Sequence, residues 1–124
     1  MNALLWTMQC LLAVIFIMPG WGKISGTVQQ HIADGHIKPG ASIVPIRILG
    51  LMEWLGCIGI IVPWYLGILP VLTPLAASGF ALIMLAGLVN HTIKKEYKML
   101  PMLSLILVMA AFVAYYRFQQ WLEL

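Results

Sequence analysis

Long apolar stretches separated by shorter polar segments run through the whole chain. A helix that crosses a bilayer needs about 17–25 predominantly apolar residues. Four stretches approach or reach this length: Ala3 to about Gly22, about Ile46 to Val62, Val71 to Asn90, and about Pro101 to Trp121. The pattern therefore predicts four membrane-spanning helices, of which the second is short and carries Arg47 and Glu53.

The boundaries of these stretches contain helix-breaking residues. No residue between Glu53 and His91 is charged, and this run is too long for a single crossing. The segment from Val62 to Pro70 contains two prolines and a glycine, so we predict a turn there between two antiparallel helices. Pro19-Gly20 predicts an end or a kink in the first helix. That helix lacks the basic start and cleavage site of a signal peptide, so we expect it to be retained.

The composition excludes most classes of soluble protein. Hydrophobic residues make up 62% of the 124 residues and charged residues only 9%, whereas soluble domains average about 25% charged residues. The sequence has no basic stripe of the kind that would indicate a nucleic-acid partner. We therefore predict one domain over residues 1–124, an all-α integral membrane protein built as a four-helix transmembrane bundle.

The connection from Ile24 to Pro45 is the only long one. Its apolar residues Ile24, Val28 and Ile32 recur at helical spacing, with polar residues between them. This pattern predicts a short interfacial helix between helices 1 and 2.

The basic residues predict how the chain is oriented. With four crossings, the first and third connections share one face of the membrane. That face holds every Lys and Arg except Arg117: Lys23, Lys38, Arg47, Lys94, Lys95 and Lys98. Because basic residues concentrate in cytoplasmic loops, we expect a multi-pass protein of the cell (inner or plasma) membrane with both termini outside the cytoplasm.

Glu53 is the most informative ionisable residue, because a charge at the centre of a span costs about 2.5–3.5 kcal/mol on insertion scales. Arg47 lies six positions earlier and therefore on a different side of the same helix. Lys23 and His91 end the first and third helices at the same depth. We predict a polar pocket of Lys23, Arg47, Glu53 and His91, roofed by residues 24–45. The alternative is purely structural: the cations reach lipid phosphates, His91 caps a helix, and Glu53 locks the bundle.

Small residues predict which helix faces meet, since they let helices approach closely in lipid. The second helix has one face with Gly50, Glu53, Gly56 and Cys57, and the third has one with Gly79, Ala86, Gly87, Asn90 and His91. We expect these two faces to pack against each other.

The remaining candidate groups predict no catalytic residue and no metal site. Cys10 and Cys57 lie within spans without zinc or redox spacing. A membrane-embedded thiol pair is conceivable, but buried apolar cysteines are commoner. His31 and His36 are five residues apart, which is the wrong spacing for one helical face.

Several segments together resemble the DoxX-like family of small bacterial membrane proteins. They are the Gly20-Trp21-Gly22-Lys23-Ile24 segment, the Arg47 to Gly56 block, Leu72-Thr73-Pro74-Leu75-Ala76-Ala77, and His91. The similarity spans about Leu4 to Phe118. It implies a four-helix membrane protein linked to redox systems, because the family takes its name from a subunit of a thiosulfate–quinone oxidoreductase. Lys23, Arg47, Glu53 and His91 match the family's polar positions.

These observations favour a redox-associated protein that binds a quinone or another lipophilic molecule near the cytoplasmic leaflet. In that interpretation Arg47 and His91 donate hydrogen bonds to the ligand, Glu53 orients them or relays a proton, and Lys23 neutralises Glu53. Two alternatives stay open: a small proton-coupled transporter, and a non-catalytic accessory subunit of a membrane oxidoreductase. Whether the chain is an enzyme, which cofactor it uses and whether it forms a homodimer are left open by the sequence.

Overall fold

Each apolar stretch forms one long helix in the computed structural model, which describes all of residues 1–124. Every one of them is long and apolar enough to cross a membrane. The predicted all-α fold with four spanning helices is therefore confirmed. The helices are α1 (Asn2–Ser25), α3 (Val44–Leu66), α4 (Leu72–Ile93) and α5 (Leu100–Leu122).

A short helix, α2 (Val28–Ala33), lies between α1 and α3, as predicted. Thr27 begins it with a reciprocal cap: the Thr27 hydroxyl accepts from the backbone N–H of Gln30, and the Gln30 side chain accepts from the N–H of Thr27. Such a capping box satisfies two backbone donors that a helix start leaves unpaired. A single 3₁₀ turn, η1 (Tyr97–Met99), precedes α5.

Prolines shorten neither α1 nor α3. α1 continues past Pro19 to Ser25, and α3 continues past Pro63 to Leu66. The turn predicted over Val62–Pro70 is therefore shorter than expected, because residues 62–66 belong to α3. Pro63 has no N–H for the carbonyl of Gly59, one turn earlier. The hydroxyl of Thr73 donates to that carbonyl instead, at 2.9 Å, which compensates for the missing backbone bond. α3 ends at Gly67, whose φ of 70° is a left-handed conformation that favours glycine.

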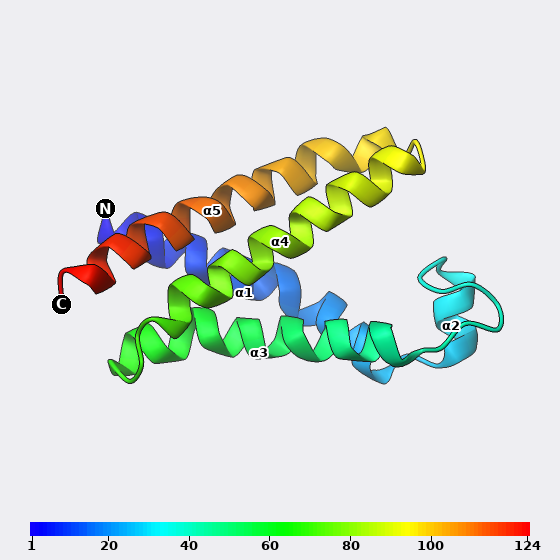
Figure 1. Cartoon of the computed structure of the whole chain (residues 1–124), viewed down its shortest axis with the longest axis horizontal. Helices are drawn as coiled ribbons and strands as arrows, with labels where there is room; N and C mark the ends of the chain where they lie inside the picture. The colour runs from blue at the N-terminus through cyan, green and yellow to red at the C-terminus, as the bar shows by residue number, and fades with distance from the viewer.

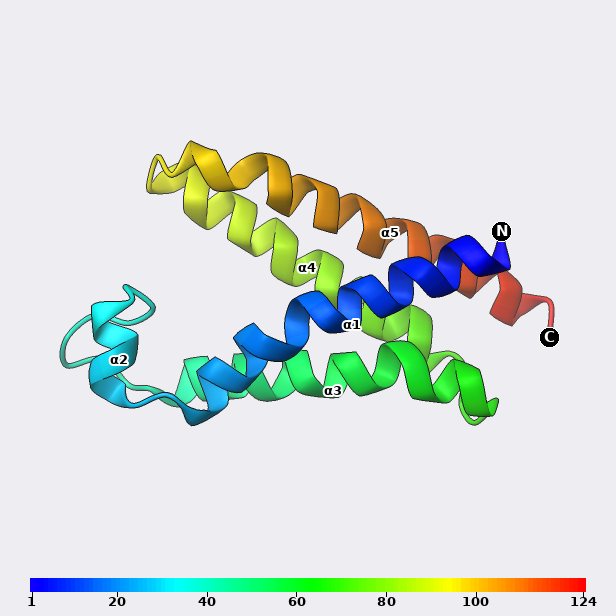
Figure 2. The ribbon, with the colours of Figure 1, turned by 180° about the vertical axis from the view of Figure 1, so that it is seen from behind.

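The helices pack as two closely paired units that cross each other. α1 lies along α3, α4 lies along α5, and the α3–α4 and α1–α5 contacts join the two pairs. Both chain termini lie at one end of the bundle, and α2 and the α4–α5 turn lie at the opposite end (Figures 1 and 2). We call the latter the α2 end. Towards it, α4 diverges from α3 (Figure 1).

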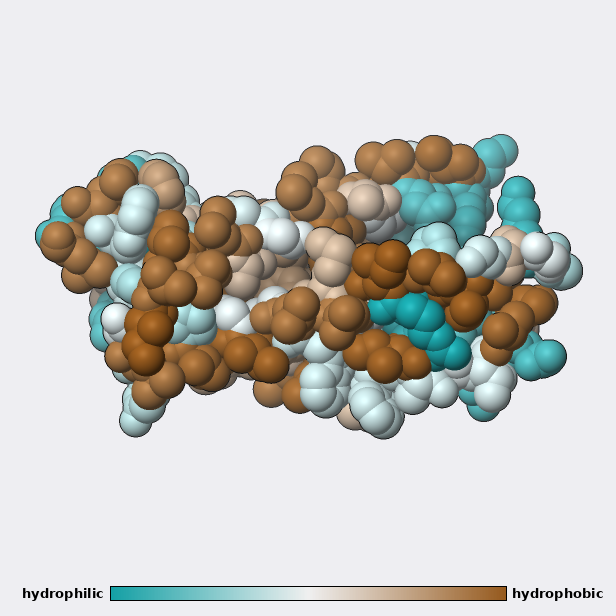
Figure 3. Space-filling model, turned by 60° about the horizontal axis from the view of Figure 1, so that its bottom comes forward, coloured by the Kyte–Doolittle hydropathy of each residue, from teal (hydrophilic) through white to brown (hydrophobic).

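The core is small because most apolar side chains point outward. Only 20 of the 124 residues are buried, which suits a bundle whose surroundings are lipid. The rings of Phe16 and Phe80 stack at the centre, with centroids 4.1 Å apart. Hydrophobic residues cover much of the surface in Figure 3, and strongly hydrophilic ones gather towards the α2 end. The remaining core residues are Leu5, Leu12, Cys57, Ile60, Ala77, Ile106, Ala110 and Val113.

Candidate functional site

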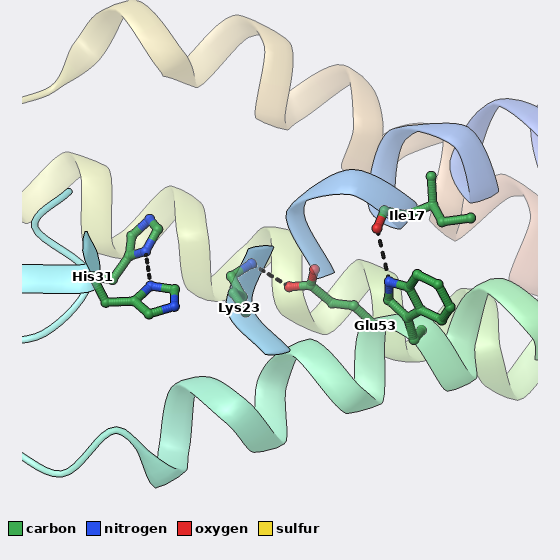
Figure 4. Close-up of polar contacts among 6 residues, drawn as sticks. Ile17, Lys23, His31 and Glu53 are labelled. Atoms are coloured by element: carbon green, nitrogen blue, oxygen red, sulfur yellow. Dashed lines mark hydrogen bonds and ion pairs between the residues drawn. The ribbon is translucent and has the colours of Figure 1, made fainter. Parts of the chain in front are cut away.

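A buried ion pair joins α1 to α3 near the α2 end. The Nζ of Lys23 lies 2.6 Å from Oε1 of Glu53, and Glu53 reaches from α3 towards the end of α1 in Figure 4. The Glu53 side chain is only 1% exposed, whereas that of Lys23 is 20% exposed. A carboxylate buried in an apolar environment is stable when a cation pairs with it. The second carboxylate oxygen, Oε2, accepts no hydrogen bond from the protein.

Two glycines allow the close helix contact that this ion pair needs. A Cβ on Gly50 would lie 2.7 Å from the Cβ of Lys23 and 2.8 Å from the carbonyl oxygen of Gly20. A Cβ on Gly20 would lie 2.6 Å from Cδ1 of Trp54. Any larger residue at either position would push α1 and α3 apart. The glycines therefore bring Lys23 within reach of Glu53.

Arg47 holds the last turn of α1 in place. Its Nη1 donates to the carbonyl oxygen of Lys23, at 3.2 Å, and to that of Ile24. The last carbonyls of a helix have no partner within the helix, and a cation there also interacts favourably with the helix dipole. Arg47 thus caps α1 at the residue that pairs with Glu53. We call Lys23, Arg47 and Glu53 the ion-pair site.

Further side chains of α3 bond to carbonyl groups along α1. The indole Nε1 of Trp54 donates to the carbonyl of Ile17 at 2.9 Å (Figure 4). The thiol of Cys57 lies 3.5 Å from the carbonyl oxygen of Ala13. These contacts extend the α1–α3 interface from the ion-pair site towards the middle of the bundle, and they fix the register of the two helices.

His91 does not join the other three predicted residues. Its Nδ1 lies 3.6 Å from Oε2 of Glu96, just beyond the end of α4. The predicted packing of two small-residue faces is met only in part. Gly56 of α3 packs against α4, where an added Cβ would lie 2.7 Å from the ring of Phe80. Gly50 instead faces α1, Gly87 is nearest to Leu103 of α5, and no atom lies within 4 Å of a Cβ placed on Gly79. The divergence of α4 from α3 leaves His91 on the other helix pair.

A pocket of about 540 Å³ adjoins the ion-pair site at the α2 end. We call it the α2 pocket. Its wall is formed by the end of α1, by α2 and by the turn that follows α2, and it includes Gly22, Lys23, Gln30, His31, Asp34 and His36. Lys23 is the residue that the pocket and the ion-pair site share. Lys23 therefore belongs both to the ion pair with Glu53 and to the wall of this pocket.

His31 and His36 meet in this wall although their spacing does not suit one helical face. The chain turns back after α2, and the two Nδ1 atoms lie 2.9 Å apart (Figure 4). His31 is 3% exposed, and its Nε2 has no hydrogen-bond partner. No group of three metal-ligating side chains is present. Burial, together with the charge of His31, lowers the pKa of His36 below its ordinary 6.5.

A second polar cluster, which the sequence analysis did not find, lies near the chain termini. Arg117 of α5 is 1% exposed. Its Nε donates to Gln9 Oε1 at 2.7 Å, and its Nη1 donates to the side-chain oxygens of Asn2 and Gln120. Gln9 in turn donates to the carbonyl of Ile60 at 2.6 Å. The sequence feature that could have revealed this network is the presence of polar residues within the apolar first and last helices.

The guanidinium of Arg117 also lies against two indole rings, of Trp6 at 5.3 Å and of Trp64 at 4.6 Å. Such cation–π contacts stabilise a cation without an opposite charge. The cluster joins α1, α3 and α5 through neutral partners. It contributes to packing, and nothing connects it to the ion-pair site at the other end.

The two cysteines do not form a pair. Cys10 is exposed on the outside of the bundle, Cys57 is buried, and both thiols are free. The commoner interpretation of such residues, as apolar packing groups, therefore suits Cys57.

These features define a class of protein: a small multi-pass membrane bundle with a buried ion pair at one end. The model of the DoxX-like family matches residues 7–113, which is most of the chain. The chain therefore belongs to the DoxX-like family, and the predicted resemblance is confirmed. No curated protein and no solved structure matches it.

Proposed function

We propose that this protein binds a lipophilic small molecule of the quinone kind, with the polar head in the α2 pocket beside Lys23. The observation that supports this most directly is the shared position of Lys23, which bonds to buried Glu53 through its ammonium group and also lines the pocket. An ammonium group has three donors. It can therefore keep its bond to Glu53 and donate another to a ligand carbonyl.

The chemistry of the pocket suits a ligand with both acceptor and donor groups. Lys23 supplies a donor and Asp34 an acceptor, and both residues line the pocket. Glu53 does not line the pocket itself and acts through its bond to Lys23. A quinone head alternates between carbonyl and hydroxyl forms, and its apolar tail would lie in the surrounding lipid.

Arg47 has a supporting part in this proposal. It bonds to carbonyl groups of α1 and so positions Lys23, rather than facing the ligand. His91 lies on the other helix pair and has no part in the binding of the head. Under the orientation expected from the basic residues, the α2 end faces the cytoplasm.

The alternative of proton-coupled cation transport has less support. A carboxylate that captures a cation during transport must become free of its protein partner. Glu53 is instead paired with Lys23 at 2.6 Å and held between two closely packed helices. We therefore place ligand binding ahead of transport.

Binding can be measured by tryptophan quenching, because Trp21 and Trp54 form a ring pair, 5.6 Å between centroids, beside the ion-pair site. The full chain in nanodiscs would be titrated with decylubiquinone, with empty nanodiscs as the blank for partitioning. The double variant Lys23→Met/Glu53→Gln removes the cation without leaving an unpaired carboxylate. We expect about tenfold weaker binding, the value of one charge-assisted hydrogen bond.

Lys98→Met is the matched control, since Lys98 is an exposed cation at the same end but outside the pocket. It should bind the quinone like the unmodified chain. Equal affinity of the double variant and the unmodified chain would refute the proposal, as would an equal loss in both variants.

A further inference from the structure

The contact between His31 and His36 depends on how many protons the two rings carry. Their Nδ1 atoms face each other at 2.9 Å. One Nδ1 must therefore carry a hydrogen and the other must accept it. The contact is satisfied when both rings are neutral, and also when one is protonated, because one acceptor is still present. When both rings are protonated, both Nδ1 atoms are donors and two like charges face each other.

The histidine contact also forms part of the wall of the α2 pocket. His31 comes from α2, and His36 comes from the turn that folds back beneath it, where the N–H of His36 bonds to the carbonyl of His31 at 2.9 Å. Both residues line the pocket together with Lys23 and Asp34. α2 itself has few contacts with the long helices. The position of this wall therefore depends strongly on contacts within residues 26–36.

The charged groups around the pair favour one proton over two. Asp34, in the same turn, favours a positive charge on His36. Lys23 at the end of α1, Lys94 beyond the end of α4, and the neighbouring His31 all oppose it. His31 is buried, and its Nε2 has no partner that would stabilise a second charge.

We propose that the contact between His31 and His36 keeps the wall of the α2 pocket closed while both rings are neutral or only one is protonated. Protonation of both rings breaks the contact and opens the wall. We call this pair of histidines the clasp. Opening separates the turn at residues 34–36 from α2 and exposes Lys23 to entering molecules. The consequence for ligand entry rests on the proposed function, but the clasp itself does not require any ligand.

Two measurements on the full chain in nanodiscs test the clasp without a ligand. The first is a side-chain ¹⁵N NMR titration of the three histidines. We expect His31 and His36 to titrate as a coupled pair, with the second proton bound clearly below pH 6.5, the ordinary value. In His36→Gln, we expect His31 to titrate in a single step. Independent single-step titration of both rings in the unmodified chain would overturn the proposal.

The second measurement follows the movement. Spin labels at Lys38→Cys, just after the turn, and at Lys98→Cys in η1 report the distance between these two segments by pulsed EPR, with Cys10 and Cys57 replaced by serine. We expect a narrow distance distribution at about pH 7.5 and a broader or longer one at about pH 5. His31→Gln and His36→Gln should each abolish this change.

His91→Gln is the matched control, since it removes the only other histidine and should leave the pH response intact. A distribution that stays the same at both pH values would overturn the clasp even if the titration is coupled, and so would a response that persists in His31→Gln and His36→Gln. Because no quinone is present, these outcomes are independent of whether quinone binding succeeds.

Discussion

The hydroxyl of Thr73 donates to the carbonyl of Gly59, which Pro63 leaves without its usual backbone partner. Thr73 is fully buried, so water cannot replace it. We expect Thr73→Val to lower the free energy of unfolding by about 1 kcal/mol, the net value of one hydrogen bond. Thermal unfolding in detergent measures the change. Thr92→Val is the control, because that hydroxyl bonds within its own exposed helix turn; an equal loss there would contradict the assignment.

The ion pair should behave as a coupled unit. Lys23→Met leaves Glu53 buried and unpaired, and breaking a buried pair costs about 3–5 kcal/mol. We expect the lower end of this range because Lys23 is partly exposed. Glu53→Gln should also destabilise the protein, but Lys23→Met/Glu53→Gln should lose clearly less than the sum of the two. A double-mutant cycle of unfolding free energies measures this coupling, and additive losses would show that the pair contributes no interaction energy.

The close approach of α1 and α3 should be sensitive to one methyl group. In Gly50→Ala the added carbon meets Lys23 and the backbone of Gly20 at distances below 3 Å. We expect a loss of about 1–3 kcal/mol, typical of overpacking, measured by thermal unfolding. Gly79→Ala is the control, because no atom lies within 4 Å of the added carbon. If Gly79→Ala were the more damaging change, α1 and α3 would not be packed as described.

The network around Arg117 should depend on Gln9. In Gln9→Leu, the Nε of buried Arg117 loses its acceptor and the carbonyl of Ile60 loses its donor. Hydrogen bonds to charged groups contribute about 1.5–3 kcal/mol, so we expect a loss of that order in chemical or thermal unfolding. Gln119→Leu, on the exposed side of α5, should be neutral. A neutral Gln9→Leu would mean that Arg117 is stabilised chiefly by Trp6 and Trp64.

The lowered pKa of His36 gives stability a pH dependence of defined sign. Its pKa is lowered from 6.5 by burial and by the charge of His31. Below about pH 6.5 the unfolded chain therefore binds more protons at this residue than the folded chain does. The free energy of unfolding consequently decreases as the pH is lowered. Unfolding temperatures between about pH 7.5 and 5 should show a smaller decrease in His36→Gln than in His91→Gln. The opposite order would contradict the direction of the shift.

The helices were predictable because lipid requires long apolar segments, and the sequence displays them directly. α2 was predictable from the spacing of Val28 and Ile32. Helix packing was less predictable, because glycines of one predicted face can meet different neighbours: Gly50 faces α1, whereas Gly56 packs against Phe80 of α4. The lengths of α1 and α3 were underestimated because both helices continue past a proline. In α3 the proline is tolerated because the Thr73 hydroxyl bonds to the carbonyl that Pro63 frees.

The ion-pair site was partly predictable for a related reason. A carboxylate within a span requires a cation, so a partner for Glu53 was expected, and Lys23 is that partner. Arg117 was overlooked because its partners are neutral amides far away in sequence, such as Asn2. The contact of His31 with His36 was also missed, since it depends on a turn rather than on helical spacing.

Met1 and Leu124 lie at the same end of the molecule, away from α2 (Figures 1 and 2). A short peptide linker could therefore join the two ends, and the chain could be cut open instead in the loop between α2 and α3. Such a circular permutant would keep the four-helix bundle while placing new ends beside the pocket, where a reporter domain could be attached directly to the segment that moves.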